Sequence, residues 1–417
     1  MGIEKFDPTG FNPNLNEEYR RGFISQIEAA MAGNAIMIPN PIEALQTTFN
    51  LMQSRFTLLG STSGAGKSSF IDDLYILKPW RQLRGNDKVH YEVLYYSMER
   101  KKMFKHAKWL SWMLHEDHGW LIPSDDILGW NPKGVISKSV HKAVRSYDEE
   151  MSDLLDTVHI YDGTTSVDKI ANAIRSKAKQ LGTLFTSDNI GVKKWGKGNY
   201  IAKFSAENIR QTRTGPIEIA SFVHMNKKYQ MEPNKREYVL LNPHTFITIV
   251  LDGVGLIQPR QGQSTKQAVD EITQVLADAR DVFGFSPVMV SQFNRGIADV
   301  HRQKAHGADL SPQESDFKDS GGPFQAADLV LGLFDPVRFK AYDKAGFYGG
   351  YDVLGGMKVP RGPSRFRSLH ILKNSFGVDN KAFGLGFWGE CNYFEALPTP
   401  NKEEELAHIY AKIISGK

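Results

Sequence analysis

The sequence contains one cysteine, Cys391, among 417 residues, so an internal disulfide is excluded. Such usage is typical of a reducing compartment. The chain also lacks an uninterrupted apolar run of membrane-spanning length, and its polar start, MGIEKFDPTG, has no signal-peptide core. Together these absences predict a soluble protein of the cytoplasm.

Net charge is also scarce, because 51 lysine and arginine residues nearly balance 47 acidic ones and leave +4. So small a total permits a polyanionic partner without arguing for one, since a local stripe of charge matters more. The hydrophobic and charged fractions, 41% and 24%, are near the globular average and allow a large core. A chain of this length has room for two or three average domains, although a single α/β core can be as long.

Residues 55 to 69, RFTLLGSTSGAGKSS, are the stretch around which the rest of the chain is organised. An apolar run suited to a buried strand precedes a segment of glycine, serine and threonine, and then a Gly-Lys-Ser opens an apolar helix. This order of strand, loop and helix is typical of a phosphate-binding P-loop. The residues predicted to bind nucleotide here are Ser61, Thr62, Ser63, Gly64, Ala65, Gly66, Lys67, Ser68 and Ser69.

The residue types of this loop fit the chemistry of ATP and Mg²⁺. Gly64 and Gly66 let backbone N–H groups turn toward an anion at a helix N-terminus. Lys67 would reach the β- and γ-phosphates, and the Ser68 hydroxyl would hold Mg²⁺. The motif departs from G-x-x-x-x-G-K-[ST] at its first position, where Ser61 stands. The alternative is a glycine- and serine-rich turn before a helix, with a lysine on the surface.

Three later apolar runs are each followed by a polar residue. VLYYSMER leads to Glu99, FITIVLDG to Asp252, and VMVSQ ends at Gln292. These strands alternate with helices, which predicts an α/β fold with a mainly parallel sheet covered by helices on both faces. Ligands bind at the carboxyl edge of such a sheet, so these side chains are expected near the P-loop.

The chemistry of phosphoryl transfer gives each of these residues a role. Asp252 suits a Walker B acid that orders Mg²⁺, and Glu99 suits a general base that polarises the attacking water. Gln292 suits a sensor of the γ-phosphate. Each alone could be an ordinary strand-end residue, but their shared order behind a P-loop favours one site.

The remaining segments predict the domain organisation. Residues 1–41 form an arm and a linker helix, whose apolar stripe packs either within one subunit or on a neighbour. Residues 42–400 form the ATPase domain, interrupted by an insertion of strands and loops at about 186–242. Basic and aromatic residues in this insertion suit nucleic-acid binding, although a solvated β-hairpin is the alternative. Residues 401–417 form a C-terminal tail helix.

The order of these motifs resembles that of the DnaB-type hexameric replicative helicases of phages and bacteria. The matching segments are STSGAGKSS, LYYSMER, VHIYDG, TIVLDGVGLI, VMVSQFNRGI, SDFKDSGGPFQAADLVLGLF and HILKNSFGVDNKAFGLGFWGECNYFE. The resemblance implies a RecA-like P-loop NTPase fold and a ring, usually a hexamer, with ATP at each subunit interface. It also implies single-stranded DNA in the centre of the ring, 5′ to 3′ movement, and a primase or helicase loader as partner. A viral protein of this kind would act in the host cytoplasm.

The chain departs from the family pattern in two places. It has no room for the N-terminal primase-binding domain of many relatives or for a primase domain. At the late strand, where relatives carry Lys-x-Arg, it has Lys373, Asn374 and Ser375, so the trans-acting arginine finger is unassigned. A hairpin turn centred on residues 377–379 would pair Ser375 with Lys381. Lys381 would then share a face with Lys373 and take the finger's place.

We therefore expect an ATP-dependent DNA helicase in which Lys67, Glu99, Gln292, Lys373 and Lys381 serve catalysis, and Ser68 and Asp252 hold Mg²⁺. The loop after Gln292 is expected to contact DNA phosphates through Arg295, Arg302, Lys304 and Lys318. Its alternative is an ordinary polar loop. A RecA-like recombinase or annealing mediator, or a non-catalytic ATP-binding assembly protein, remains the alternative function.

Overall fold

The computed structural model describes residues 37–132, 136–163, 165–186, 236–294, 297, 311–317, 321–360 and 362–414, and the backbone of short strands between 209 and 231. The chain divides into two compact units. The main unit comprises Met37–Ile174 and His244–Lys417, and the other comprises Met1–Ile36 and Arg175–Pro243. The insertion expected at about 186–242 thus belongs to a unit whose second segment begins at Arg175, within a helix.

The main unit is built on a nine-stranded sheet with the strand order β19-β18-β17-β14-β3-β13-β12-β4-β5. The strands from β14 to β5 are parallel, and β17, β18 and β19 add to them antiparallel. Their bounds are β3 (Thr57–Ser61), β4 (His90–Ser97), β5 (Val158–Asp162), β12 (Thr245–Asp252), β13 (Ser286–Gln292), β14 (Leu329–Phe334), β17 (Phe366–Asn374), β18 (Lys381–Trp388) and β19 (Tyr393–Ala396). The mainly parallel sheet and the late hairpin expected from the sequence are confirmed.

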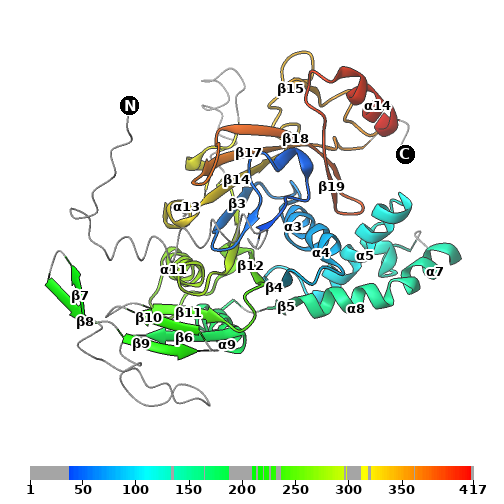
Figure 1. The fold of residues 1–417 in the computed structure, drawn as a ribbon. Helices are drawn as coiled ribbons and strands as arrows, with labels where there is room; N and C mark the ends of the chain where they lie inside the picture. The colour runs from blue at the N-terminus through cyan, green and yellow to red at the C-terminus, as the bar shows by residue number, and fades with distance from the viewer. Residues whose placement is uncertain are drawn as a thin grey trace, which may run out of the picture. The chain divides into compact units, whose positions relative to one another are not determined.

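Helices cover both faces of this sheet. They are α3 (Lys67–Asp72), the π-helical turn η4 (Asp73–Leu77), α4 (Lys78–Leu83), α5 (Lys102–His118), α6 (Ser124–Ile127), α7 (Lys138–Ser146), α8 (Asp148–Thr157), α9 (Val167–Leu181), α11 (Thr265–Phe283), α13 (Gly321–Ala326) and α14 (Glu403–Ile414). The chain leaves β3 through α3 and α4 toward β4, whereas α11 and α13 lead back in the opposite direction. Right-handed crossovers therefore place α3 and α4 on one face and α11 and α13 on the other (Figure 1).

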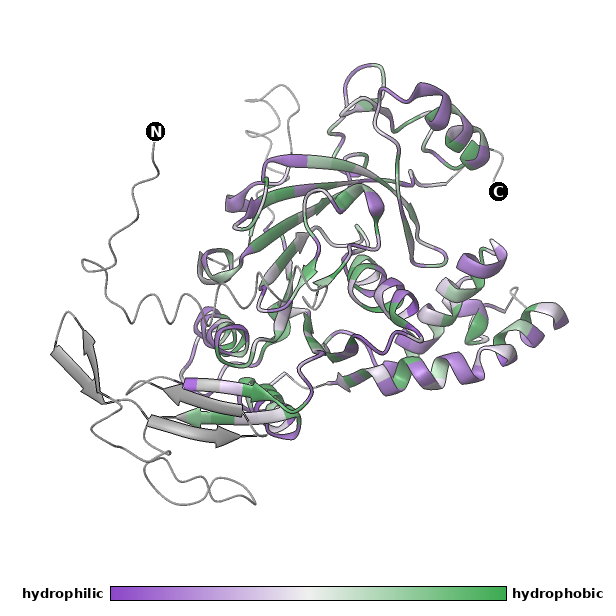
Figure 2. Ribbon diagram, in the orientation of Figure 1, coloured by the Kyte–Doolittle hydropathy of each residue, from purple (hydrophilic) through white to green (hydrophobic). Residues whose placement is uncertain are grey.

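The central strands are apolar because both of their faces are covered. Leu58, Leu59 and Val250 are completely buried, and every residue of β12 is buried. Figure 2 shows hydrophobic residues along these strands and polar residues on the outward turns of helices such as α7. Polar residues at the ends of such strands are therefore held by a rigid core.

Shorter elements complete the main unit. They are β1 (Met37–Ile38), β2 (Leu51–Met52), β15 (Phe347–Tyr348), β16 (Tyr351–Asp352) and the 3-10 turns η3 (Glu43–Leu45), η6 (Val254–Leu256) and η8 (Glu314–Asp316). Helix α14 forms within the expected tail, and its Leu406 and Ile413 are buried in one cluster with Phe366 and Trp388. The C-terminal helix is thus part of the main unit's core.

The other unit contains paired strands, as expected for the insertion. Its strands are β6 (Gly182–Thr186), β7 (Ile209–Thr212), β8 (Gly215–Glu218), β9 (Ala220–His224), β10 (Lys227–Met231) and β11 (Arg236–Leu240). Antiparallel pairs form between β6 and β11, β7 and β8, and β9 and β10. The expected linker helix and most of the basic and aromatic segment lie outside the described residues. Among those that are described, no helix is long and apolar enough to span a membrane.

Candidate active site

The loop between β3 and α3 has the backbone shape that its glycines predict. Gly64 and Gly66 have φ angles of +80° and +97°, in the left-handed region that favours glycine. A Cβ atom at Gly66 would lie 2.9 Å from the Phe387 ring. The α3 helix then begins at Lys67 and continues without a break through η4 and α4. The P-loop glycines are therefore required both by conformation and by space.

Four of the predicted residues converge at the carboxyl edge of the sheet. The Ser68 hydroxyl donates a hydrogen bond to Asp252 Oδ1 at 3.1 Å. Lys67 Nζ lies 3.9 Å from Glu99 Oε1. These side chains come from the start of α3, the end of β12 and the turn after β4, so three separate chain segments meet here.

Glu99 and Gln292 occupy the rim of this site. The Glu99 side chain is 42% exposed, against 13% for Lys67, so it can reach a solvent-filled space above the loop. A Cβ atom at Gly253 would lie 3.2 Å from Glu99 Cγ, so glycine after Asp252 leaves room for the acid. Gln292 is exposed at the end of β13 and pairs with Ser61 of β3. The sensor candidate is thus directly beside the start of the P-loop.

Asp252 is buried and its charge is compensated. Burial alone would raise the pKa of this carboxyl group, but the Lys105 ammonium and hydrogen bonds from Tyr95 and Ser68 outweigh burial and hold the pKa below its ordinary value. The Tyr95 hydroxyl donates to Asp252 Oδ2 at 2.7 Å. An ionised carboxylate beside a hydroxyl is the donor set that Mg²⁺ prefers.

The residues present fit a bound nucleotide with Mg²⁺. The Thr62 hydroxyl of the loop is buried and has no hydrogen-bond partner among the described residues, as expected where a ligand completes the site. No group of three or more His, Cys, Asp or Glu side chains in the described part of the chain could hold a metal ion. Mg²⁺ needs no such cage, because it binds through one or two carboxylates together with substrate phosphates.

Two arginines that hold the P-loop were not expected from the sequence. Arg367 of β17 is buried, donates from Nε to the Ala65 carbonyl at 3.0 Å, and pairs with Asp335 at 3.3 Å. Arg338 donates to the Ser63 carbonyl. Both contacts join positions more than 250 residues apart, and no local pattern marks them. The antiparallel extension of the sheet thus supports the loop.

The hairpin corrects the pairing expected for Lys381. Lys381 pairs with Ile371 and not with Ser375. The Ser375 N–H donates instead to the Asp328 carbonyl, and the Asn374 side chain donates to the Val378 carbonyl. These bonds shift the turn toward the N-terminus of the hairpin.

The two lysines of the hairpin have different surroundings. Lys373 Nζ donates to the carbonyls of Phe324 and Gln325 in α13, at 3.3 and 3.0 Å. Leu372 is an extra residue opposite β14, so simple alternation no longer places Lys373 on the face of Arg367. Lys381 is exposed and makes no ion pair with the residues that the structure describes. The structure therefore occupies Lys373 within its own chain and leaves Lys381 available.

The loop expected to contact DNA is closed at its base. Phe293 bridges to Phe317, and their rings meet edge to face with centroids 5.1 Å apart. The Asn294 side chain donates to the Ser315 carbonyl at 2.7 Å. The four DNA-binding candidates lie outside the described residues: Arg295, Arg302, Lys304 and Lys318. The base of the loop is thus fixed directly after Gln292.

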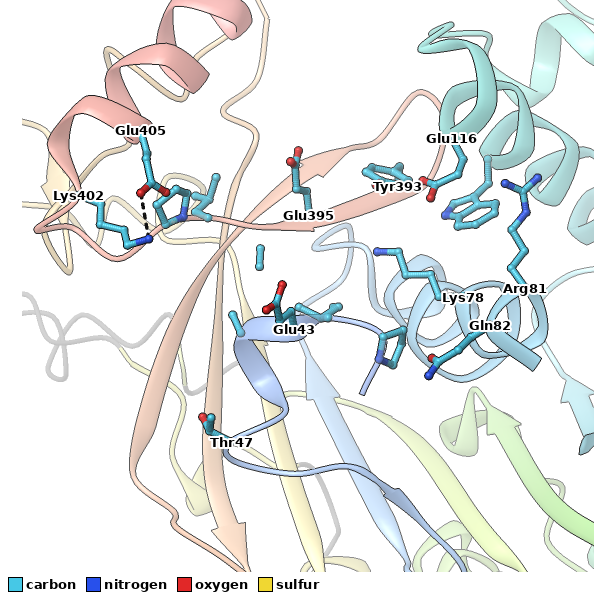
Figure 3. Close-up of a pocket in the computed structure, with 17 residues that line it drawn as sticks. Glu43, Thr47, Lys78, Arg81, Gln82, Glu116, Tyr393, Glu395, Lys402 and Glu405 are labelled. Carbon is cyan, nitrogen blue, oxygen red and sulfur yellow. Dashed lines mark ion pairs between the residues drawn. The ribbon is translucent and has the colours of Figure 1, made fainter. Parts of the chain in front are cut away.

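A cavity of about 790 Å³ lies elsewhere in the main unit and includes none of the predicted site residues. Figure 3 shows Lys78, Arg81 and Gln82 of α4 on one side of it and Lys402 paired with Glu405 on another. Lys78 is held by Asp73 at 2.7 Å. Because these cations are already paired, the cavity adds nothing to the phosphate site.

Two solved structures match the chain over most of its length. One is the ATPase domain of a DnaB-like helicase, with a TM-score of 0.58, 14% identity, and coverage of 91% of this chain and 99% of that one. The other is a DnaB-like replicative helicase described with its interactions with primase, with a TM-score of 0.55, 14% identity, and coverage of 91% and 67%. No family model matches the sequence, and no match was found among curated proteins. Identity this low shows the fold alone, and the RecA-like ATPase fold expected from the sequence is confirmed.

Proposed function

We propose that this chain is the ATP-driven motor of a DnaB-type DNA helicase, which assembles as a ring and moves on single-stranded DNA. The observation that carries the proposal is the meeting of Lys67, Ser68, Glu99 and Asp252 at one sheet edge. A RecA-like fold with this set of side chains supports nucleotide hydrolysis more directly than any other reaction.

Each side chain has a defined task in hydrolysis. Lys67 neutralises charge on the β- and γ-phosphates, and Ser68 and Asp252 hold the magnesium ion. That ion supplies charge stabilisation between the β- and γ-phosphate oxygens. Glu99 accepts a proton from the attacking water, and its 3.9 Å distance from Lys67 places it beside the γ-phosphate position.

The strand β13 offers a route from the nucleotide to DNA. Gln292 ends this strand beside the P-loop, and the clamped loop begins two residues later. A shift of Gln292 on loss of the γ-phosphate would therefore be passed to the loop that carries Arg295 and Arg302. Basic side chains on that loop would contact DNA phosphates, which gives affinity without sequence preference.

The assembly and its partners follow from the same proposal. A hexamer would complete each site with a cation from the neighbouring subunit, for which Lys381 is the exposed candidate. Primase or a helicase loader would dock on the ring, and movement would be 5′ to 3′.

The test is strand displacement on forked duplexes with a single 5′ or a single 3′ tail, alongside ATPase measurements with and without DNA. We expect ATP-dependent unwinding of the 5′-tailed fork and DNA-stimulated hydrolysis. Lys67→Ala should lose nucleotide binding. Glu99→Gln should keep binding and lose hydrolysis by about 10² to 10⁴-fold, as general bases do.

Each other outcome points to a specific alternative. Hydrolysis with strand pairing or filament formation but no unwinding would indicate a recombinase or annealing mediator. Nucleotide binding without hydrolysis would indicate an assembly protein. Parental hydrolysis by Glu99→Gln would remove the general-base assignment alone.

A further inference from the structure

A buried polar network lies behind Asp252 and takes no part in the chemistry proposed above. It consists of Lys105 of α5, Asp72 at the end of α3, and Tyr95 of β4. All three are buried, and Lys105 is only 2% exposed. Lys105 Nζ lies 3.0 Å from both carboxylate oxygens of Asp72 and 3.5 Å from Asp252 Oδ2.

The network connects the P-loop helix to the Walker B strand through one ammonium group. A buried ammonium is costly unless every N–H group finds an acceptor. Lys105 meets this need with Asp72, with the Tyr95 hydroxyl and with Asp252. Asp72 alone would balance its charge, so the contacts to Tyr95 and Asp252 are additional.

The two oxygens of Asp252 consequently have different partners. Oδ1 accepts from Ser68 at 3.1 Å, on the side where magnesium would bind. Oδ2 accepts from Tyr95 at 2.7 Å and lies near Lys105. Because Lys105 donates to the Tyr95 oxygen, the Tyr95 hydroxyl proton is directed toward Asp252. The carboxylate is therefore held in one rotamer, with a single oxygen presented to the metal.

We propose that Lys105 is a positioning residue for the magnesium site, acting on Asp252 directly and through Tyr95. The inference rests on the proposed function, since it assigns Asp252 to the metal. Partners that orient a metal-binding side chain commonly change metal affinity by about 10 to 100-fold when removed. The competing role is a structural ion pair between Lys105 and Asp72.

A double variant separates these two roles. Lys105→Met removes the ammonium but leaves Asp72 buried and unpaired, so this change alone disturbs the fold. Lys105→Met combined with Asp72→Asn removes one charge of each sign and keeps the net charge of the network. Any change in magnesium dependence of the double variant therefore reports positioning and not a change in local charge.

The measurement is the magnesium dependence of binding of a fluorescent ATP analogue, together with thermal unfolding. We expect the double variant to unfold at a temperature close to that of the parental protein, and above that of Lys105→Met. Its half-saturating magnesium concentration should rise roughly 10 to 100-fold, while binding of the analogue in EDTA stays unchanged. Tyr95→Phe, which removes only the bridging hydroxyl, should give a smaller rise.

An unchanged magnesium dependence in the folded double variant would overturn the proposal and leave Lys105 as a structural partner of Asp72. If the double variant does not fold, Tyr95→Phe decides, and parental magnesium dependence in that protein would overturn it equally. Because the readout is binding, it is independent of the proposed helicase activity. Loss of unwinding in the parental protein would overturn the proposed function and leave this result standing.

Discussion

At the scale of single residues, the region around the P-loop helix is unusual for its buried charge. Asp72, Asp73, Lys105 and Arg367 are all buried, although charged residues seldom are. Each has a partner of opposite charge within 3.3 Å. Since an unpaired buried charge costs several kcal/mol, each pair fixes two chain segments at once.

Asp73 illustrates the electrostatic cost. Its carboxylate accepts from Trp112 at 2.6 Å and from Lys78 at 2.7 Å. Burial nevertheless raises the pKa of Asp73 from its ordinary value of 3.8 to about 6, against the effect of these partners. Between these pH values the folded protein keeps a proton on Asp73 that the unfolded chain has lost.

We predict that this proton makes stability fall as pH rises. The contribution is complete below about pH 4 and is lost as pH rises through about 6. A shift of about 2 pKa units corresponds to about 3 kcal/mol. Asp73→Asn cannot ionise, so its free energy of unfolding relative to the parental protein should rise by about this amount between pH 4 and 7. Urea unfolding of both proteins measures the difference.

Asp117 provides a control of opposite sign. Burial tends to raise its pKa, but hydrogen bonds from Arg81 and Tyr147 lower it below the ordinary value. The parental protein should therefore gain stability over Asp117→Asn as pH rises from about 3 to 5. Identical pH dependence of the parental protein and Asp73→Asn would contradict the assignment.

At the scale of elements, the β17–β18 hairpin joins the nucleotide site to the outer surface. Arg367 of β17 supports the P-loop, and Lys381 is exposed at the start of β18. Arg365, another candidate finger, is held by Glu390 through two contacts of 2.8 and 3.0 Å. Arg361 lies outside the described residues. Among the described cations of this hairpin, Lys381 is therefore the best placed to act on a neighbouring subunit.

We predict that Lys381→Ala lowers DNA-stimulated ATPase activity while Lys373→Ala does so less, because Lys373 is engaged by α13. An arginine finger contributes about 10³ to 10⁵-fold, and a lysine without its planar fork should contribute roughly 10 to 100-fold. The measurement mixes Lys381→Ala subunits with Lys67→Ala subunits. Mixed rings should recover part of the activity that neither variant has alone.

The matched control mixes Lys67→Ala with Glu99→Gln. Both changes lie within one nucleotide site, but each subunit still offers an intact hairpin to its neighbour. This mixture should stay inactive, because every subunit has lost either its P-loop lysine or its general base. Full activity of Lys381→Ala alone would exclude the lysine and return attention to Lys373 or Arg361.

At the scale of the whole molecule, the insertion is attached through two adjacent strands. Thr186 at the end of β6 is paired with Arg236 at the start of β11. The main unit contains the complete nine-stranded sheet and all of the residues that meet at the nucleotide site. The segment between 187 and 235 is therefore not needed to build the site.

We predict that replacing residues 187–235 by Asn-Gly leaves a folded protein with unchanged nucleotide affinity. Two such residues form the turn that joins directly paired antiparallel strands. Circular dichroism and titration with a fluorescent ATP analogue check the outcome, and Lys67→Ala in the shortened chain controls for binding outside the P-loop. An aggregated product or lost binding would show that the insertion supports the main unit. Weaker binding of single-stranded DNA by the shortened chain would assign the insertion a role there.

The sequence by itself determined the parts of this protein that depend on local order. The P-loop is one continuous stretch whose glycines need particular φ angles, so its spacing identifies it. Glu99, Asp252 and Gln292 follow strands, and parallel strands place their carboxyl ends on one edge of the sheet. The order of these motifs therefore predicted both the fold and the convergence of the site.

Only the tertiary structure decided which distant side chains support that site. Lys105 reaches Asp252 across 147 positions, and Arg367 reaches the P-loop across 302. Neither position carries a local pattern, because a buried cation is specified by partners brought together in folding. The register of Lys381 was wrong in the sequence prediction for the same reason. It depends on bonds from Ser375 and Asn374 to residues outside the two strands, which hairpin symmetry does not include.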